Sequence, residues 1–264
     1  MQVPTTAQIN EINDTIDQAL RLEKQAQDDA DQGHFDRAEG KLKRAAGLKQ
    51  KAIRLADKYY GIDKDPASRH LRGEPRYDPR VEGEGVTVLA GGGNGRVSLG
   101  PDTFVFNGKA SAAWLASTKV HEILGHIPQI QGDGWIPGDN NEQELEAYAQ
   151  EYDHRATTGL TDDEIQEIRR RMQRHYRRLP PRLKPRWRRN YPFVEKCAAF
   201  IYRNRETGKM LYCTNDSGDA TPDYVKIGAG DFPCDQTGYC SIRQSATDTD
   251  RRNRSKVRFA LRLS

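Results

Sequence analysis

Apolar residues in the first sixty positions recur at helical spacing, in two runs separated by a polar break at residues 31–34. Steps of three and four place such side chains on one face of a helix. The first run is Ile9, Ile12, Ile16 and Leu20, and the second is Phe35, Ala38, Leu42, Ala45, Ala52 and Ala56. The pattern predicts a helical hairpin over residues 7–60. Because one hairpin cannot bury its own apolar faces, we expect an appended or docking element, with specific peptide binding as the alternative. A delivery partner is one contact that such a hairpin could make, and the sequence does not decide it.

Three short apolar stretches follow, separated by turn residues as is typical of antiparallel strands. They are Val86–Leu89, Arg96–Leu99 and Thr103–Phe106. Asn94-Gly95 precedes the second stretch and favours a tight hairpin turn. The glycines before Asn94 lack the Gly-Lys-Ser/Thr ending of a phosphate-binding loop, so a nucleotide site is not expected there.

The middle of the chain predicts three more helices. The first begins near residue 109 or 110 and ends at about Ile127, before Pro128. The second covers residues 140–154 and is rich in glutamate. The third opens at a capping box, Thr161–Glu164. Its apolar stripe is Ile165, Ile168, Met172, Tyr176 and Leu179.

The last third changes to strand patterns and predicts a small antiparallel domain. Its expected strands are Ala199–Tyr202, Lys209–Tyr212, Asp223–Ile227, Tyr239–Ile242 and Val257–Leu263. The predicted fold class is therefore α+β, with three parts. These are a helical hairpin over residues 1–62, a compact catalytic core with a basic helix over 63–190, and a cysteine-containing β-rich domain over 191–264.

Composition limits where the protein acts. The apolar fraction is 35%, and mean hydropathy is −0.90. No apolar run reaches the length of a membrane span, and the first residues lack the basic and apolar regions of an ordinary signal peptide. We expect secretion without an ordinary signal peptide, or otherwise a cytoplasmic location.

Positive charge is concentrated in one segment, although the net charge is only +4. Eleven Arg or Lys residues and no Asp or Glu lie between Ile168 and Asn190. Two interpretations stay open for Arg169–Arg189, a solvated helix face or a contact with a polyanion such as nucleic acid or an anionic surface.

All four cysteines lie in the last third of the chain, at positions 197, 213, 234 and 240. None forms a CxxC pair, so a structural zinc site is not expected. Two disulfides with undetermined pairing are one interpretation, and reduced buried thiols are the other.

The sequence His121-Glu122-Ile-Leu-Gly125-His126 carries the clearest chemistry. Imidazole nitrogens suit zinc, and the adjacent carboxylate can act as a general base. The two histidines are five residues apart, which on a regular α-helix separates them by roughly 140°. A one-residue π-bulge would bring them to one face, and we expect Gly125 to permit it.

This motif resembles the HExxGH motif of the dipeptidyl peptidase III family of zinc peptidases. The resemblance implies that His121 and His126 bind Zn²⁺ and that Glu122 is the general base. In such enzymes a glutamate on the following helix is the third ligand. Glu144-Leu-Glu146-Ala147 resembles the ExEA signature of gluzincin peptidases, which implies Glu144, while Glu142 and Glu146 remain alternatives. Gluzincins often carry an Asp four residues after this ligand, where the chain has Tyr148.

Two residues of the glutamate helix are candidates for donating a hydrogen bond to the oxyanion, Tyr148 and His154. Core packing or exposure is the alternative for both. In the loop before this helix, Trp135 is expected to form one wall of a specificity pocket or to anchor the loop.

Together these features predict a zinc metallopeptidase that hydrolyses peptide bonds of a protein or peptide substrate. The assembly of parts resembles bacterial secreted effectors or toxins with metallopeptidase heads. The alternative is a non-enzymatic polyanion-binding protein that uses the Arg-rich segment, and a third interpretation is a purely structural metal clamp.

Overall fold

The computed structural model describes residues 1–130, 141–213 and 224–232. The chain divides into two compact units, Met1–Ile165 and Gln166–Ser264. The structure is mostly helical with small sheets, which confirms the α+β class and the N-terminal hairpin. The three-part division at residues 62 and 190 and a zincin-like core stay predictions. None of the helices in the described ranges is long and apolar enough to cross a membrane.

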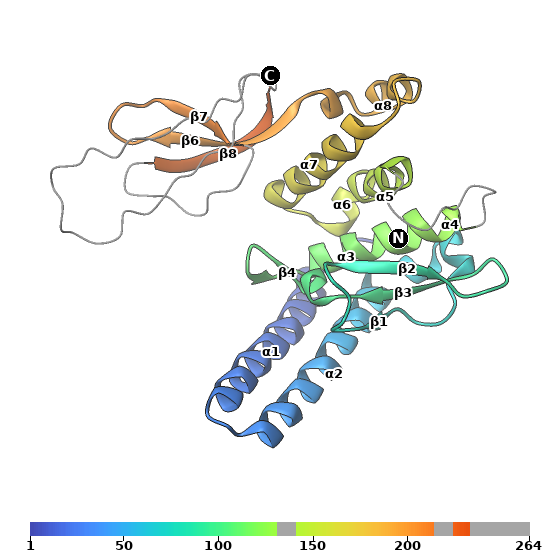
Figure 1. Ribbon diagram of the computed structural model, residues 1–264, viewed down its shortest axis with the longest axis vertical. Helices are drawn as coiled ribbons and strands as arrows, with labels where there is room; N and C mark the ends of the chain where they lie inside the picture. The colour runs from blue at the N-terminus through green and yellow to red at the C-terminus, as the bar shows by residue number, and fades with distance from the viewer. Residues whose placement is uncertain (131–140, 214–223, 233–264) are drawn as a thin grey trace. The chain divides into compact units, whose positions relative to one another are not determined.

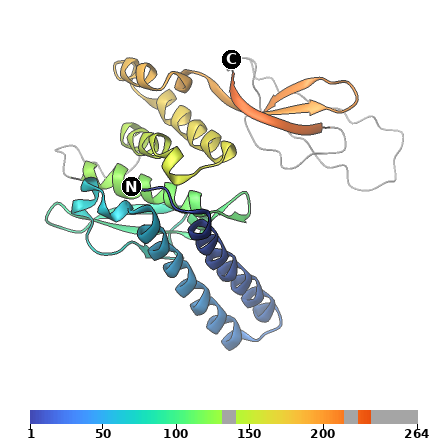
Figure 2. The same cartoon turned by 180° about the vertical axis from the view of Figure 1, so that it is seen from behind.

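The hairpin consists of α1 (Thr6–Asp31) and α2 (Phe35–Tyr60), which lie side by side along their length (Figures 1 and 2). The N-terminus of α1 has a capping box, in which the Thr5 side chain accepts from the Gln8 N–H and the Gln8 side chain accepts from the Thr5 N–H. Gly61 ends α2 in the left-handed conformation that glycine adopts most easily. Because α1 ends at Asp31 and α2 begins at Phe35, the break predicted at residues 31–34 is correct.

The apolar faces of the hairpin belong to the main core of the first unit, which they share with α3 (Ala112–Val120). Every residue of α3 except Ala113 is buried, so this helix lies in the middle of the unit. Trp114 is 2% exposed, as expected for a core residue. The shared core includes Ile12, Ile16, Ala52, Ile53, Ala56, Leu115, Ala116, Val120 and Ile123.

Two hairpins of strands accompany this core. The strands β2 (Gly85–Leu89) and β3 (Gly95–Leu99) pair antiparallel across the predicted turn, and β1 (Arg76–Tyr77) pairs parallel with β3 on its other side. The order β1-β3-β2 leaves β2 at an edge of the sheet. β4 (Val105–Phe106) and β5 (Lys109–Ala110) form the second hairpin.

The helix after β5 differs from the prediction at both ends. Lys109 and Ala110 are in a strand, and the helix begins only after Ser111, whose side chain accepts from the Trp114 N–H. A π-helical segment, His121–His126, follows α3 directly, and α4 (Ile127–Gln129) continues past Pro128. Proline is tolerated there because it lies at the start of a new α segment, where its missing N–H matters least.

The remaining elements follow in chain order. The glutamate helix is α5 (Asn141–Asp153), followed by α6 (Arg155–Thr158) and α7 (Asp162–Arg178). Thr161 and Glu164 form the predicted capping box. Short 3-10 turns cover Ile62–Lys64, Pro66–His70, Pro101–Phe104 and Pro192–Glu195.

The second unit contains α8 (Lys184–Asn190) and a sheet in the order β7-β6-β8. The central strand β6 (Cys197–Asn204) pairs antiparallel with β7 (Met210–Cys213) on one side and with β8 (Tyr224–Phe232) on the other. The hairpin of β6 and β7 was expected. The side chains of Cys197 and Cys213, and all of Cys234, Cys240 and Trp135, lie outside the described residues, as do the predicted strands after residue 232.

Candidate metal centre

The π-helical segment brings the two histidines of the motif together. Its wider turn places the Nε2 atoms of His121 and His126 3.1 Å apart, although the residues are five positions apart in the chain. Both residues are 7% exposed. Helices of this kind are rare and often occur at functional sites. The predicted π distortion is confirmed.

Gly125 has a different role from the one we expected. Its backbone keeps a helical conformation, so no unusual φ requires glycine. Instead α5 lies so close that a Cβ on Gly125 would be 2.6 Å from the Cβ of Ala147. The missing side chain thus lets the glutamate helix contact the π-helical segment directly.

This close contact brings Glu144 to the histidine pair. Glu144 Oε2 lies 3.4 Å from His121 Nε2, and Glu144 Oε1 lies 3.5 Å from His126 Nε2. One ligand atom from each residue can be chosen so that all three lie within 4.8 Å of one another. Glu146 does not join this group among the described residues, and its Oε2 accepts from the amide Nε2 of Gln129 at 3.4 Å. Among the described residues, Glu142 does not join it either.

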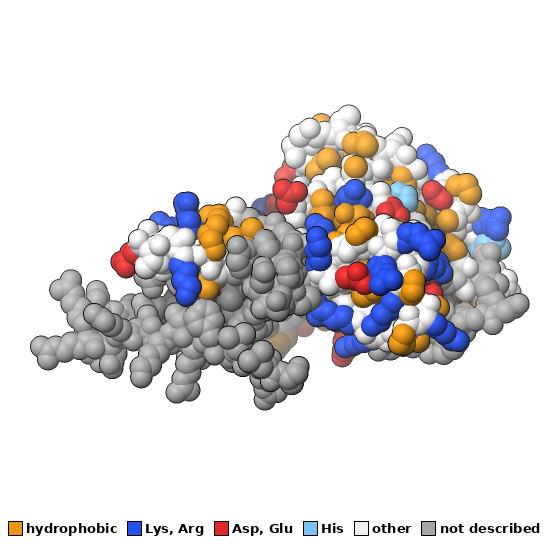
Figure 3. Space-filling model, turned by 90° about the horizontal axis from the view of Figure 1, so that it is seen from above, with side chains coloured by type: hydrophobic (Ala, Val, Ile, Leu, Met, Phe, Trp, Pro, Cys, Tyr) orange, Lys and Arg blue, Asp and Glu red, His pale blue; other side chains and the backbone are white. Residues whose placement is uncertain are grey.

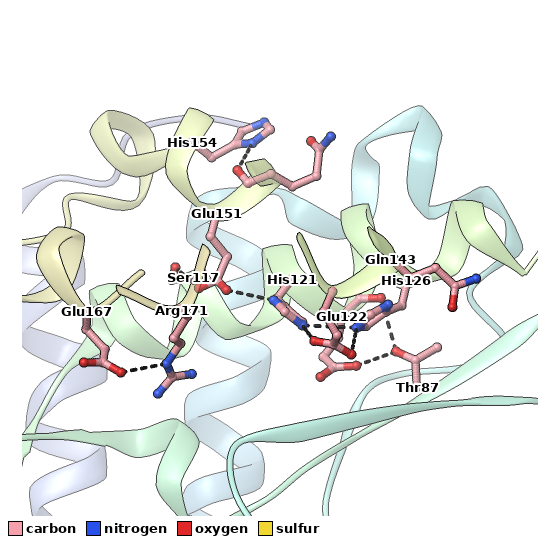
Figure 4. Close-up of polar contacts among 12 residues, drawn as sticks. Thr87, Ser117, His121, Glu122, His126, Gln143, Glu151, His154, Glu167 and Arg171 are labelled. Carbon is pink, nitrogen blue, oxygen red and sulfur yellow. Dashed lines mark hydrogen bonds and ion pairs between the residues drawn. The ribbon is translucent and has the colours of Figure 1, made fainter. Parts of the chain in front are cut away.

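Each histidine ring is held at its other nitrogen by a side-chain acceptor, and Figure 4 shows the one behind His121. His121 Nδ1 donates to Glu151 Oε1 at 2.8 Å, and Ser117 Oγ donates to Glu151 Oε2 at 2.5 Å. Glu151 is 3% exposed. A carboxylate behind a ligand histidine fixes its tautomer and makes it a better ligand.

Gln129 has the corresponding role behind His126. Its amide Nε2 donates to the Gln143 carbonyl oxygen at 2.9 Å, which fixes the orientation of the amide group. Its Oε1 therefore faces His126 Nδ1, at 2.8 Å, and accepts from it. With both Nδ1 atoms acting as donors, neutral rings direct two lone pairs at each other across 3.1 Å. A proton on one Nε2, which would then donate to the other, or a metal ion bound by both would remove this repulsion.

The pKa values of the two histidines are shifted in opposite directions. Burial lowers the pKa of His121, but hydrogen bonds to Glu144 and Glu151 outweigh burial and raise this pKa well above its ordinary value. Burial and the charge on His121 together lower the pKa of His126. One positive charge is thus favoured between the rings, and a second one is disfavoured.

Glu122 lies between the helix and strand β2. Its Oε2 accepts from Thr87 Oγ at 2.6 Å (Figure 4), and a Cβ on Gly85 would be 2.8 Å from its Oε1. Glycine at position 85 thus leaves room for the carboxylate. Burial raises the pKa of Glu122, which the charges on His121 and His126 partly oppose. A carboxyl group with a raised pKa beside possible metal ligands suits proton transfer near neutral pH.

The two candidate oxyanion donors occupy different places. The ring of Tyr148 packs edge-on against His121, with the ring centroids 4.4 Å apart. His154 Nδ1 lies 2.8 Å from the Gln150 carbonyl oxygen, one turn back, and Figure 4 shows its side chain pointing away from the histidine pair. Of the two, Tyr148 is the one beside the possible ligands.

Sequence reasoning missed Glu151, Gln129 and Thr87. Glu151 could have been identified from the sequence, because it is seven residues after Glu144 and therefore two helical turns along the same face of α5. Thr87 and Gln129 reach the site only through tertiary packing. Comparisons with models of protein families, with curated protein sequences and with solved structures find no match for this chain. The buried group of His121, His126 and Glu144, which could hold a metal ion, thus rests on the chain's own geometry.

Proposed function

We propose that this protein is a zinc-dependent metallopeptidase that hydrolyses peptide bonds of a protein or peptide substrate. The observation that carries the proposal is the 3.1 Å approach of His121 Nε2 to His126 Nε2, with both Nδ1 atoms already bound to acceptors. A cation ligated by both rings and by Glu144 relieves the repulsion between the nitrogen lone pairs.

The donor set fits zinc. Two imidazole nitrogens and one carboxylate are the protein ligands of many catalytic zinc sites, which keep a further position open. A structural clamp uses four protein ligands, and within the described part of the chain no fourth His, Cys, Asp or Glu belongs to the group. The ligand count therefore favours catalysis over a clamp.

Zinc, when bound, supplies Lewis-acid chemistry that polarises a substrate carbonyl and makes water more acidic. In our proposal Glu122 accepts the proton of the attacking water on its carboxylate and returns it to the nitrogen of the leaving amine. The Thr87 hydroxyl holds one carboxylate oxygen, and Glu151 and Gln129 hold the two histidine rings. Tyr148 is proposed to donate a hydrogen bond from its hydroxyl group to the developing oxyanion.

The position of β2 supports a peptide substrate. This strand is at the sheet edge, and its Thr87 contacts Glu122. An edge strand has unpaired backbone N–H and C=O groups, to which an extended peptide can add as a further strand. A substrate bound in this way would run past the proposed base.

Metal content tests the proposal. We expect about one zinc per chain in the purified wild type by plasma mass spectrometry, and its loss in His126→Ala and Glu144→Ala. Glu146→Ala is the matched control on the same helix and should keep the metal. Absence of metal from the wild type, or zinc retained without Glu144, would overturn the assigned ligand set.

Turnover tests the base. Glu122→Gln preserves size and hydrogen bonding but cannot accept the proton, so it should keep zinc and lose cleavage of an unstructured protein such as casein. Proteolysis that persists in this variant would exclude the mechanism.

We also propose that the peptidase acts as a secreted bacterial effector or toxin, in which the hairpin contacts a delivery partner. The support is the combination of a metal centre with a helical hairpin and a strand-rich, cysteine-containing segment. Expression of the wild type should then impair growth of a target cell, while Glu122→Gln should not. Equal growth with both proteins would count against the effector role.

A further inference from the structure

The second unit presents a strongly basic surface at the C-terminal half of α7 and in the segment that contains α8. Arg170 and Arg171, earlier in α7, pair with Glu167, and the segment between Ile168 and Asn190 contains no acidic residue of its own. The exposed members of this basic surface are Arg174, Arg177, Arg178, Arg182, Arg186, Arg188 and Arg189. Figure 3 shows a face of the molecule on which Lys and Arg side chains gather.

Several of these arginines lie on the same face of their helix. Arg174 and Arg178 are four residues apart in α7, and Arg186 and Arg189 are three apart in α8, so each pair lies on one helix face. Arg188 Nη1 lies 3.5 Å from Glu195 Oε1, and both side chains are exposed. Seven exposed arginines in a stretch of sequence that contains no Asp or Glu make this segment strongly positive.

The apolar sides of the two helices are unavailable to a membrane. Binding to a bilayer by a helix requires an exposed apolar face that enters the lipid. Here the apolar residues of α7 and α8 are buried, so only the charged side is presented. They are Ile168, Met172, Tyr176 and Trp187.

The residue types point to phosphate. Ten of the eleven cations in the segment are arginine, whose planar guanidinium binds phosphate oxygens through two hydrogen bonds. The two aromatic side chains of these helices, Tyr176 and Trp187, are buried and cannot stack on unpaired bases. Contacts of this kind suit the backbone of a duplex, in which the bases are already paired.

We infer that this basic surface binds the phosphate backbone of double-stranded nucleic acid, without reading its sequence. The inference is independent of the proposed peptidase activity, because none of its residues belongs to the metal centre. It assigns the protein a second partner besides its substrate.

The test uses the full chain and two matched triple variants. Arg174→Gln, Arg182→Gln and Arg189→Gln together remove three exposed charges of the basic surface. Arg21→Gln, Arg44→Gln and Lys51→Gln remove the same charge from exposed positions of the hairpin. Glutamine keeps a good helix propensity, and circular dichroism with thermal melting checks that both variants fold.

Binding is measured by fluorescence anisotropy, over a range of salt concentrations, with short labelled DNA and RNA duplexes of one sequence. Loss of three phosphate contacts should weaken binding by about tenfold or more and reduce the slope of log affinity against log salt by about 2 to 3. The hairpin variant should stay within about twofold of the wild type. The two duplexes distinguish DNA from RNA as the source of the phosphates.

Three outcomes would overturn the inference. The first is no binding of either duplex by the folded wild type. The second is equal weakening in both variants, which would indicate net charge alone. The third is sedimentation with vesicles that contain phosphatidylserine, but not with phosphatidylcholine vesicles, in the absence of duplex binding.

Discussion

Gly125 and Ala147 meet where the π-helical segment crosses α5, and a Cβ at position 125 would lie only 2.6 Å from the Ala147 Cβ. The backbone of the π-helical segment at Gly125 thus contacts the Ala147 side chain of α5 directly. The distance between the histidines and Glu144 depends on this approach, because Glu144 precedes Ala147 by less than one turn of α5.

Gly125→Ala should therefore separate the two elements and weaken the metal centre. We expect a loss of about 1–3 kcal/mol in unfolding free energy from overpacking, and zinc affinity lower by about tenfold or more. Gly47→Ala is the control, since Gly47 is helical, exposed and has no atom within 4 Å of a new Cβ. That change should stabilise α2 by up to about 1 kcal/mol. Equal effects on zinc affinity in the two variants would disprove this role of Gly125.

Glu151→Ala should weaken metal binding without removing a ligand. The change takes away the acceptor behind His121 Nδ1, and loss of such a partner typically lowers metal affinity by about 10–100-fold. Glu151→Gln keeps one acceptor oxygen, so its metal affinity should lie between those of the wild type and Glu151→Ala. Competition with a coloured chelator measures the affinities, and melting of the metal-free proteins separates binding from folding. Unchanged affinity in a folded Glu151→Ala protein would contradict the assignment.

Lys119 and Asp57 form a buried ion pair that joins α3 to α2. The Lys119 side chain is 0% exposed, and burial raises the pKa of Asp57 and lowers the pKa of Lys119. Asp57→Ala leaves an unpaired buried cation and should cost about 3–5 kcal/mol in unfolding free energy.

The double variant Asp57→Leu with Lys119→Met should regain most of that loss, because no charge is then left unpaired. Urea denaturation of the single and double variants gives the coupling between the two positions. Additive losses would show that the two side chains act independently.

Tyr60 should make the protein less stable in alkali. Burial raises its pKa to about 12, from about 10 in an unfolded chain. Below pH 10 both states keep the proton and the full stability is present. Between about pH 10 and 12 only the unfolded state releases it, so the unfolding free energy should fall by about 2 kcal/mol.

Tyr60→Phe isolates this effect, because the other tyrosines titrate in both proteins. The variant loses the hydrogen bond from Tyr60 to the Thr158 carbonyl oxygen, which should cost about 1 kcal/mol at neutral pH. Its stability should then fall less steeply above pH 10. Parallel stability curves for the two proteins would disprove the predicted titration.

The elements that the sequence predicted correctly depend on local patterns. The hairpin follows from apolar spacing, the β2–β3 turn from Asn94-Gly95, and the π distortion from the five-residue interval between two histidines. Each of these structural features is thus indicated by residues that lie close together in the sequence. Glu144 was also placed correctly beside the histidines, through its position in a short motif.

The features that escaped prediction depend on residues far apart in the chain. Thr87 is thirty-five positions from Glu122, and Glu151 is thirty from His121. Both contacts depend on how β2 and α5 pack against α3 and the π-helical segment. For Thr87 no local pattern indicates this, whereas Glu151 is two turns after Glu144 on the same face of α5. The packing role of Gly125 was also missed, because its neighbour Ala147 belongs to a different helix.

The π-helical segment also has a genetic consequence. Deletion of the single codon for Leu124 would leave His-Glu-Ile-Gly-His, the four-residue interval that a regular α-helix needs to align two histidines. The π turn takes up this one extra residue, so the shortened segment, as a regular helix, would keep His126 and the residues after it on their present faces. Ile127 and Ile130, now 0% and 7% exposed, would stay in the core. The extra residue is thus accommodated within the segment itself, and its removal should preserve both the alignment of the histidines and the packing that follows.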